Sequence, residues 1–581
     1  MYRANHVELK EPPHVRAQIE QLVSDALASA AAAGELSLAV VPDSAVERPR
    51  DRSHGDWASS VALRCAKEAG MAPRDVASIV ARHLGETDRV ASVEIAGPGF
   101  INIRLSNAAL DDIAREARNA DRTYGSSLVG QGTKVQVEFV SANPVGPMHV
   151  GHGRWAALGD AMANLLAHTG HEVEREYYIN DAGNQMDIFG ASVAARYLEL
   201  CGQSVEFPAD GYAGAYIVEI AREIRDDEGD AWVDADPAER ELHFRERSYA
   251  QVLAHLEHVL HEFGVDFEVW FSERRVHQVA ADGSTEITRA IDTLREAGYI
   301  YEHEGALWFR STDFGDDKDR VLVKADGAYT YFAADIAYHK DKFDRGFDRV
   351  IDLWGADHHG YIARLKGAVA ALGHPGKLDI VIGQLVNLFR GGQAVRMSKR
   401  TGEMVTFEEL VADVGVDAAR YWFLRRSSDQ QVDFDIDLAT ERSADNPVYY
   451  VQYAYARICS IIRKAYGADP DDVAAVDGLA AERIAADTDL TPLTEPAELD
   501  LIRKLGELPE VVEGAARDLA PHRLTTYAED LAATFHHFYA HCRVMDDDAA
   551  IASARLYLAD ATRRVLRTTL GLLGVSAPER M

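Results

Sequence analysis

The feature that most constrains the fold is a strand–loop–helix–strand succession over residues 134–179. Lys134–Val140 (KVQVEFV) is a short run rich in β-branched residues, which predicts a buried strand. A loop rich in proline and glycine follows, and then a helix that we expect to end at Gly170. Residues 172–179 (EVEREYYI) predict a second strand. Together these elements form a βαβ unit, the seed of a parallel, doubly wound α/β sheet.

Other regions surround this unit. The N-terminal region predicts a separate α/β domain, with a helix over Pro13–Gly34 and two strands around the turn Gly97-Pro98-Gly99. Further strands are expected near residues 306–309, 349–354 and 378–389. Asn446-Pro447 marks the start of a helix with an apolar stripe, and the chain reads as a helical bundle from there on. The predicted divisions are 1–125, 126–395 with a helical insertion at about 195–275, 396–440 and 441–581.

Composition excludes several classes of protein. The formal net charge of −33 argues against a uniformly basic nucleic-acid-binding protein, although a local basic groove stays compatible with it. The four cysteines lie far apart, which disfavours a disulfide framework and a cysteine-built zinc site. No stretch reaches the roughly 18 to 20 apolar residues of a membrane span, and residues 1–15 lack the apolar core of a secretory signal. We expect a cytoplasmic protein without membrane contact.

The first motif with chemical content is His149-Val150-Gly151-His152, which lies between the first strand and its helix. Backbone N–H groups at a helix start form an anion site, and two imidazoles one turn apart would add donors toward the same phosphates. Gly151 would let a nucleotide approach the backbone closely. An exposed histidine pair is the simpler alternative, but the position between strand and helix favours a phosphate site.

The second motif is the basic segment Arg396–Gly402 (RMSKRTG), about 240 residues later. Three cations within five residues predict a loop that closes over phosphates, whereas the simpler interpretation is a solvated basic turn. Thr406 and Glu409 have the spacing of a capping box that starts the next helix. Because the chain as a whole is strongly acidic, a cluster of three cations favours a phosphate-binding loop over a solvated basic turn.

Together the two motifs resemble those of class I aminoacyl-tRNA synthetases, which carry a His-x-Gly-His turn and a Lys-Met-Ser-Lys-Ser loop. Three longer strings, VEFVSANPVGPMHVGH, REYYINDAGNQ and DNPVYYVQYAYARICSI, resemble bacterial arginyl-tRNA synthetases. The resemblance covers essentially the whole chain. It implies a Rossmann-like doubly wound catalytic domain, an α/β N-terminal tRNA-binding domain and an all-α C-terminal anticodon-binding bundle. Arg396 departs from the family pattern, because many class I enzymes have lysine there, so we assign the main phosphate role to Lys399.

The resemblance also implies an arginine pocket. A guanidinium is a planar fork of donors that carboxylates bind best. The family pattern places Glu138 and Asp335 in this pocket, with Tyr331 one helical turn before Asp335. It places Ser141 and Asn143 in the loop that enters the site, where they could hold the α-groups of the amino acid. Taken one at a time, each acid could be a surface ion pair and Tyr331 a core aromatic.

For ATP, the resemblance implies catalytic roles for His149, His152 and Lys399, and contacts from Gly151, Met397 and Ser398. Asp357 and His358 follow a predicted strand and would lie near the adenosine, although a capped loop without a ligand is an alternative. Mg²⁺ would accompany ATP. We expect no zinc and no other protein-held metal, because the histidines near residues 258 and 541 have no suitable partners in the sequence.

The predicted function is therefore arginine–tRNA ligation, with ATP, L-arginine and tRNA-Arg as partners, by a monomer. Two other functions compete with it. A small-molecule adenylyltransferase can share the His-x-Gly-His turn, but such enzymes are usually much shorter and have no terminal bundle. A catalytically silent tRNA-binding relative would lack the two histidines or Lys399, and all three residues are present. The family pattern further implies that arginine activation requires bound tRNA.

Overall fold

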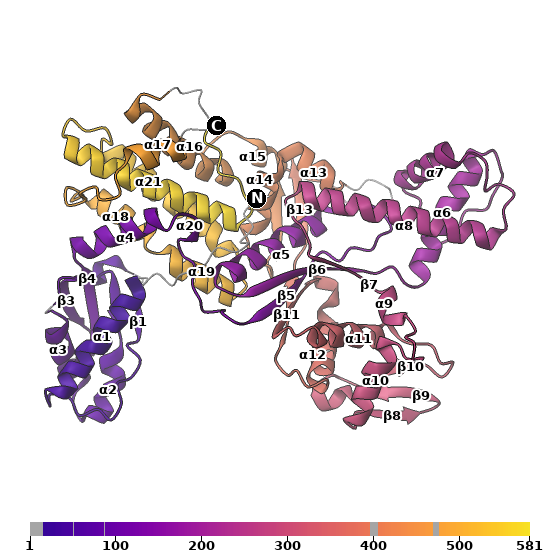
Figure 1. Cartoon of the computed structure of the whole chain (residues 1–581), viewed down its shortest axis with the longest axis horizontal. Helices are drawn as coiled ribbons and strands as arrows, with labels where there is room; N and C mark the ends of the chain where they lie inside the picture. Colours follow the sequence, from indigo (N-terminus) through magenta and orange to yellow (C-terminus); the bar gives the residue numbers. More distant parts are fainter. Residues whose placement is uncertain (1–14, 50, 86, 396–404, 469–475) are drawn as a thin grey trace.

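The computed structural model describes residues 15–49, 51–85, 87–395, 405–468 and 476–581. It is a mixed α/β molecule with a parallel sheet at its centre, as the sequence predicts. Figure 1 shows an N-terminal module at one side, a helical insertion projecting at the other, and a helical bundle beside the central sheet. No helix in the described residues is long and apolar enough to cross a membrane.

The N-terminal module is built on a four-stranded antiparallel sheet in the order β1-β2-β4-β3. The predicted helix and the two strands around Gly97-Pro98-Gly99 are all present. Gly70 ends α2 with a φ of 65°, so the apolar pattern over residues 61–84 is divided into two helices. The elements are α1 (Val15–Ala32), β1 (Val46–Glu47), η1 (Arg52–His54), β2 (Trp57–Ser59), α2 (Val61–Ala69), α3 (Pro73–Leu84), β3 (Val90–Ala96) and β4 (Phe100–Leu105).

The next helix, α4 (Asn107–Asn119), leaves this module and packs on the C-terminal bundle. Its inner face carries buried apolar residues and the buried Arg118. The short helix η2 (Asp121–Thr123) follows and packs on α21 (Ala549–Leu572) of the bundle, before the chain enters the central sheet. Two ends of the chain that are distant in sequence therefore share one apolar core.

The central sheet, later called the catalytic sheet, has five parallel strands in the order β12-β11-β5-β6-β7. Along the sequence β5 is the first strand of this sheet. Strands β6 and β7 follow on one side of it, and β11 and β12 follow later on the other side. The order therefore reverses between β5 and β11, where ligands of such sheets bind. The strands are β5 (Lys134–Glu138), β6 (Glu172–Ile179), β7 (Val269–Ser272), β11 (Arg349–Gly355) and β12 (Leu378–Gly383).

Helix α5 (Val150–His168) connects β5 to β6, as predicted, and Gly170 follows it with a φ of 89°. Gly159 permits its close packing, because a Cβ there would lie 2.1 Å from the Phe139 ring. The insertion between β6 and β7 consists of α6 (Asn184–Leu200), α7 (Ala215–Glu228) and α8 (Pro237–Glu262). Between β7 and β12 lie α9 (Arg274–His277), α10 (Glu286–Glu296), β8 (Ile300–His303), β9 (Ala306–Phe309), η3 (Ser311–Phe314), β10 (Arg320–Val323), α11 (Tyr331–Asp344), η4 (Ala356–Tyr361) and α12 (Ile362–Ala371).

Two segments expected to form strands join separate sheets. Residues 306–309 form β9 in a small antiparallel sheet, β10-β9-β8. Residues 378–389 form two strands, because the chain leaves the parallel sheet after β12 and continues as β13 (Val386–Arg390) in the sheet β14-β13-β15. The remaining elements of this connecting region are β14 (Gln393–Ala394), α13 (Phe407–Val414), α14 (Val416–Leu424), β15 (Val432–Asp435) and α15 (Ile436–Thr440).

The described part of the chain after residue 446 is helical, as predicted. Asn446 and Pro447 hold the N-cap and first-turn positions of α16, and the predicted apolar stripe is buried. The bundle consists of α16 (Pro447–Tyr466), α17 (Val476–Arg483), α18 (Pro496–Leu505), α19 (Leu508–Arg517), α20 (His522–His541) and α21 (Ala549–Leu572).

Candidate active site

The predicted anion site at His149–His152, called the anion turn below, lies at the first turn of α5. His149 is the N-cap and His152 the third helical residue, and each backbone N–H donates to Nδ1 of the other ring, at 3.2 and 3.3 Å. The rings stack with centroids 3.6 Å apart. Because both Nδ1 atoms accept, a neutral ring carries its proton on Nε2. Both imidazoles can thus act as donors beside the positive end of a helix dipole.

Trp155 brings this turn to the carboxyl ends of two other strands. Its indole lies edge-on to both histidines, with centroids 5.9 and 5.4 Å away. A Cβ built on Gly355, the last residue of β11, would lie 3.3 Å from this ring, and one on Gly383 of β12 only 2.1 Å from it. These glycines leave room for the indole, which fixes the position of the turn at the edge of the sheet.

The predicted loop residues Met397, Ser398 and Lys399 lie outside the described residues. The chain is described again from residue 405, and this segment is bonded to the anion turn: His149 and Thr406 form an antiparallel bridge, and Phe407 N donates to Met148 O at 2.9 Å. Thr406 and Glu409 form the predicted capping box. Thr406 and Phe407 are thereby fixed beside the turn that carries His149.

Glu138 is buried at the end of β5 and contacts several polar groups. Its Oε2 accepts from Lys342 Nζ at 2.6 Å and from Tyr338 OH at 2.9 Å. Its Oε1 accepts from Ser141 Oγ at 3.0 Å, and that hydroxyl accepts from Tyr178 N at 3.1 Å. Glu138 and Ser141 thus lie together, and Glu138 is an interior carboxylate rather than a surface ion pair. Their contact with arginine stays a prediction.

The loop after β5 has unusual backbone geometry. Val140 and Ser141 have φ angles of 68° and 41°, in the left-handed region that L-residues rarely adopt, a β-branched residue least of all. Asn143 Nδ2 donates to Gln185 Oε1 at 3.0 Å. Such strain persists only where surrounding contacts hold it, and it is common at functional sites.

Asp335 lies one helical turn after the start of α11, and its Oδ2 accepts from Tyr361 OH at 2.5 Å. Burial raises the pKa of Asp335 to about 6, and the neighbouring Glu273 and Glu138 also raise it, whereas the Tyr361 hydrogen bond lowers it. Tyr331 is 70% exposed, so it is not a core aromatic. Its hydroxyl lies 3.8 Å from the position of a Cβ on Gly183. A cavity of about 710 Å³ opens here, and Tyr331, Glu273, Arg274 and Lys324 contribute to its lining.

Asp357 and His358 occupy η4, directly after β11, as predicted for the carboxyl end of a strand. Their side chains are 83% and 62% exposed. His358 Nε2 lies 3.7 Å from Asp357 Oδ1. Because both side chains are exposed, they are accessible to a ligand at the edge of the sheet. Their contact with adenosine stays a prediction.

Sequence reasoning missed Glu273 and Tyr361. Glu273 directly follows β7, is only 4% exposed and lines the cavity beside Tyr331. The signal was present, because an acid at the carboxyl end of a parallel strand meets the same criterion that selected Asp357. Tyr361 ends the segment Asp357–Tyr361, and only its contact with Asp335 reveals a role.

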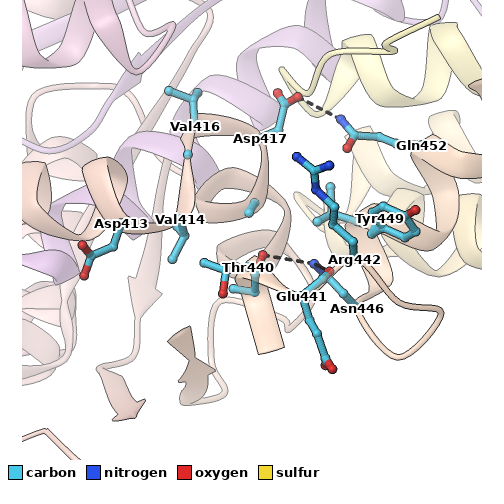
Figure 2. A pocket seen from close by; sticks show the side chains of 14 residues that line it. Asp413, Val414, Val416, Asp417, Thr440, Glu441, Arg442, Asn446, Tyr449 and Gln452 are labelled. Carbon is cyan, nitrogen blue, oxygen red and sulfur yellow. Dashed lines mark hydrogen bonds between the residues drawn. The ribbon is translucent and has the colours of Figure 1, made fainter. Parts of the chain in front are cut away.

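A second cavity of about 550 Å³ lies where the connecting region meets the bundle (Figure 2). Gln452 Nε2 donates to Asp417 Oδ2 at 2.8 Å, and Asn446 Nδ2 donates to the backbone oxygens of Ala439 and Glu441. In Figure 2 the Arg442 side chain extends toward the Asp417–Gln452 pair. The cavity is polar and lies at the N-termini of α14 and α16, apart from the residues assigned to chemistry.

Helix α16 presents aromatic side chains next to this cavity. Tyr449 and Tyr453 stack with centroids 6.0 Å apart, and His536 from α20 lies against Tyr453. Tyr455, on the same helix, is 2% exposed and belongs to the core. The structure thus separates surface tyrosines from buried ones, a distinction that the sequence did not reveal.

Three family models match consecutive parts of the chain. They are described as arginyl tRNA synthetase N terminal domain (residues 17–105), tRNA synthetases class I (R), catalytic domain (residues 117–439), and DALR anticodon binding domain (residues 451–581). The catalytic model alone covers more than half of the chain.

Full-length relatives agree with these matches. The chain is 52% identical over 561 residues to the arginine–tRNA ligase of Moorella thermoacetica, covering 96% of this chain and 98% of that protein. It is 49% identical to the one of Heliobacterium modesticaldum, covering 98% and 99%. A solved structure from Campylobacter jejuni, described as a putative arginyl-tRNA synthetase, superposes with a TM-score of 0.73 at 32% identity and covers 82% of this chain and all of that one.

Proposed function

Since the chain belongs to the arginyl-tRNA synthetase family and is an arginine–tRNA ligase, we propose that it activates L-arginine with ATP at the carboxyl edge of its parallel sheet and transfers it to tRNA-Arg. One observation carries the proposal. The segment that follows the basic motif is bonded to the histidine turn, at an edge of the sheet that also carries buried acids. These contacts support a shared site for the phosphates of ATP and the guanidinium of arginine.

In the first step a carboxylate oxygen of arginine attacks the α-phosphorus of ATP. The bond from this phosphorus to the bridging oxygen breaks, and pyrophosphate leaves with the electron pair. His149 and His152 stabilise the α-phosphate as charge develops, and Gly151 admits the nucleotide to the backbone of the turn. Lys399 holds the departing pyrophosphate, with Met397 and Ser398 beside it, while Asp357 and His358 contact the adenosine.

ATP enters this step as its Mg²⁺ complex. In the described residues no three His, Cys, Asp or Glu side chains are grouped as metal ligands. Magnesium in such sites is held largely by phosphate oxygens and water, so the donor set expected of the protein is small. The ion belongs with the triphosphate and supplies charge neutralisation there.

The arginine side chain occupies the pocket at the start of α11. Asp335 pairs with the guanidinium, and Tyr331 covers it from the rim. Ser141 and Asn143 hold the α-amino and α-carboxylate groups, and Glu138 accepts the hydrogen bond of Ser141. Catalysis thus consists of positioning and charge stabilisation, without a covalent enzyme intermediate.

In the second step the 2′-hydroxyl oxygen of the terminal ribose attacks the carbonyl carbon of arginyl-adenylate. The bond from this carbon to the phosphate oxygen breaks, AMP leaves with the electron pair, and the hydroxyl proton is released. The surface tyrosines of α16 supply stacking platforms for unpaired anticodon bases. The N-terminal module adds a second tRNA contact. We propose that the enzyme acts as a monomer in the cytoplasm, where its tRNA is used.

An ATP–pyrophosphate exchange assay with each of the 20 amino acids, with and without tRNA, tests the substrate assignment. Exchange should occur with arginine and depend on tRNA. Exchange with another amino acid would overturn the substrate, and equal exchange without tRNA would remove the tRNA requirement.

The role of Lys399 has its own test. Lys399→Ala should depress exchange strongly and leave tRNA binding nearly intact, because the lysine acts on phosphates of ATP. Full exchange activity in this variant would remove the assigned role.

A further inference from the structure

Three neighbouring strands of the catalytic sheet carry a carboxylate at the same register. Asp352 of β11 pairs with Glu138 of β5, and Glu138 pairs with Glu176 of β6. All three residues are buried, with 0%, 8% and 0% exposure. Paired residues of adjacent strands project to the same face, and like charges directly opposite each other destabilise a sheet. This acid row (Asp352, Glu138 and Glu176) therefore requires counter-charges.

Helix α11 and the residue that follows it supply two of these counter-charges. Lys342 Nζ donates to Glu138 Oε2 at 2.6 Å and to Asp352 Oδ1 at 2.9 Å, and its side chain is fully buried. Arg345 forms an ion pair with Glu176, with Nη1 2.7 Å from Oε2. Although burial lowers the pKa of Lys342, Asp352 and Glu138 raise it above its usual value. The ammonium is therefore charged when buried.

The third group that contacts the acid row is His339. Its Nδ1 lies 2.8 Å from the backbone oxygen of Asp335, and its Nε2 lies 2.8 Å from Asp352 Oδ2. Burial opposes ionisation of Asp352, but Lys342 and His339 hold its pKa down to about 2. Each of the three acids therefore has a cationic partner, because Lys342 pairs with Glu138 and Asp352 and Arg345 pairs with Glu176.

Glu138 connects this acid row to the strained loop. Lys342 Nζ donates to one of its oxygens, and the other accepts from Ser141, whose φ is 41°. Two further acids lie outside the row: Asp335, bonded to Tyr361, and Glu273 at the lining of the cavity. Neither of these two carboxylates contacts Lys342 in the described structure, so they stay available to a cationic substrate.

We propose that Lys342 is a positioning residue for arginine activation, which neutralises Glu138 and Asp352 so that Glu138 holds the Val140–Asn143 loop while Asp335 and Glu273 face the guanidinium. The inference rests on the proposed arginine pocket. It makes Glu138 a support for Ser141 rather than a direct partner of the substrate's charge. Removal of Lys342 would leave Glu138 beside Asp352 without its cation, and the carboxylate would reorient or take up a proton.

The test compares Lys342→Met, Glu138→Gln and the double variant in arginine-dependent pyrophosphate exchange with tRNA present. Lys342→Met should raise the KM for arginine about tenfold or more and change the KM for ATP less than about threefold. The double variant removes one acid with one cation, and the amide that Glu138→Gln introduces can still bond to Ser141. Its KM for arginine should return to within about threefold of the wild-type value.

The arginine KM of the double variant distinguishes two possible roles of Glu138, support of Ser141 and direct binding of the guanidinium. If the carboxylate itself binds the guanidinium, the double variant will be at least as impaired as Lys342→Met, and the inference is overturned. Equal changes in the KM values for arginine and ATP would also overturn it. Should Lys342→Met not fold, the double variant alone decides: an arginine KM within about threefold of wild type supports the inference, and a larger rise contradicts it.

A matched control is available on the same helix. Lys340 pairs with Asp344, its i+4 neighbour at the surface of α11, so Lys340→Met should leave both KM values unchanged. Failure of the proposed function has a different signature, because the wild-type enzyme would then show no arginine-dependent exchange. Wild-type exchange combined with an unaltered arginine KM in Lys342→Met refutes only the positioning role.

Discussion

At the scale of single residues, Asp335 connects the protonation state of the pocket to substrate binding. Burial raises its pKa to about 6, so in the free enzyme the carboxyl group is ionised above that pH and neutral below it. A guanidinium binds the ionised form. The KM for arginine should therefore be about tenfold higher at pH 5 than at pH 7, because a pH one unit below the pKa leaves about a tenth of the groups ionised.

The measurement is pyrophosphate exchange over this pH range with arginine varied. Asp335→Asn supplies the control, since it should show a high arginine KM that no longer changes between pH 5 and 7. If the arginine KM of the variant still changes with pH as in the wild type, another group is responsible for the pH dependence.

A second residue-scale prediction concerns Gly383 at the end of β12. A methyl group there would lie 2.1 Å from the Trp155 ring, so the indole that supports the histidine turn would have to move. Gly383→Ala should lower the free energy of unfolding by about 1–3 kcal/mol. It should also raise the KM for ATP more than the KM for arginine.

Gly478→Ala is the matched control, because nothing lies within 4 Å of a Cβ at that helical position. Denaturant unfolding and exchange kinetics on both variants provide the comparison. An ATP KM in Gly383→Ala equal to that of the control would show that Trp155 does not position the turn.

At the scale of elements, α4 is joined to α21 by a buried charge cluster. Asp560 is fully buried and contacts three arginines: Arg118 Nε at 2.8 Å, Arg563 Nη2 at 2.8 Å and Arg564 Nε at 3.0 Å. Removing the acid leaves buried cations without their partner. Asp560→Asn should therefore lower the free energy of unfolding by about 3–5 kcal/mol, measured with urea.

Asp547→Asn tests the same chemical change at the surface, where the Asp547 side chain is 91% exposed. Its unfolding curve should match that of the wild type. Equal stability of the two variants would mean that the cluster contributes nothing to the docking of α4.

The elements that could be predicted from sequence are those with local signals. The β5–α5–β6 unit, the Thr406–Glu409 capping box and the start of α16 each depend on residues within a few positions of one another. The division of residues 378–389 between two sheets could not be predicted, since both halves are apolar and the partner of β13 is β15, more than 40 residues later.

The same limit applies to the site. Sequence motifs identified the histidine turn, Asp335 and Ser141 as candidate site residues. They did not identify Lys342, because its proposed role depends on its contact with Glu138, which lies 204 residues earlier in the chain. Tyr361 and Glu273 were hidden for the same reason, although the strand end before Glu273 was a usable signal.

At the scale of the whole molecule, the proposed tRNA contacts lie on a different unit from the arginine pocket, on the outer face of α16 in the bundle. Tyr453 is 38% exposed and stacks on Tyr449. Stacking of one base contributes about 1–3 kcal/mol, so Tyr453→Ala should raise the KM for tRNA about fivefold or more. At saturating tRNA the KM values for arginine and ATP should be unchanged.

Aminoacylation with tRNA varied provides this measurement. A rise in the arginine KM at saturating tRNA would show that the tyrosine also affects the pocket. An unchanged tRNA KM would remove the stacking role.

The position of α4 also determines how the chain can be made. Its docking surface on α18 and α21 comes last in the sequence, and Asp560 follows Arg118 by 442 residues. At about 5–20 residues per second, a ribosome needs roughly 20 to 90 s to cover that distance. Until α21 has been synthesised, the apolar side of α4 in the nascent polypeptide lacks part of the surface on which it packs in the folded chain.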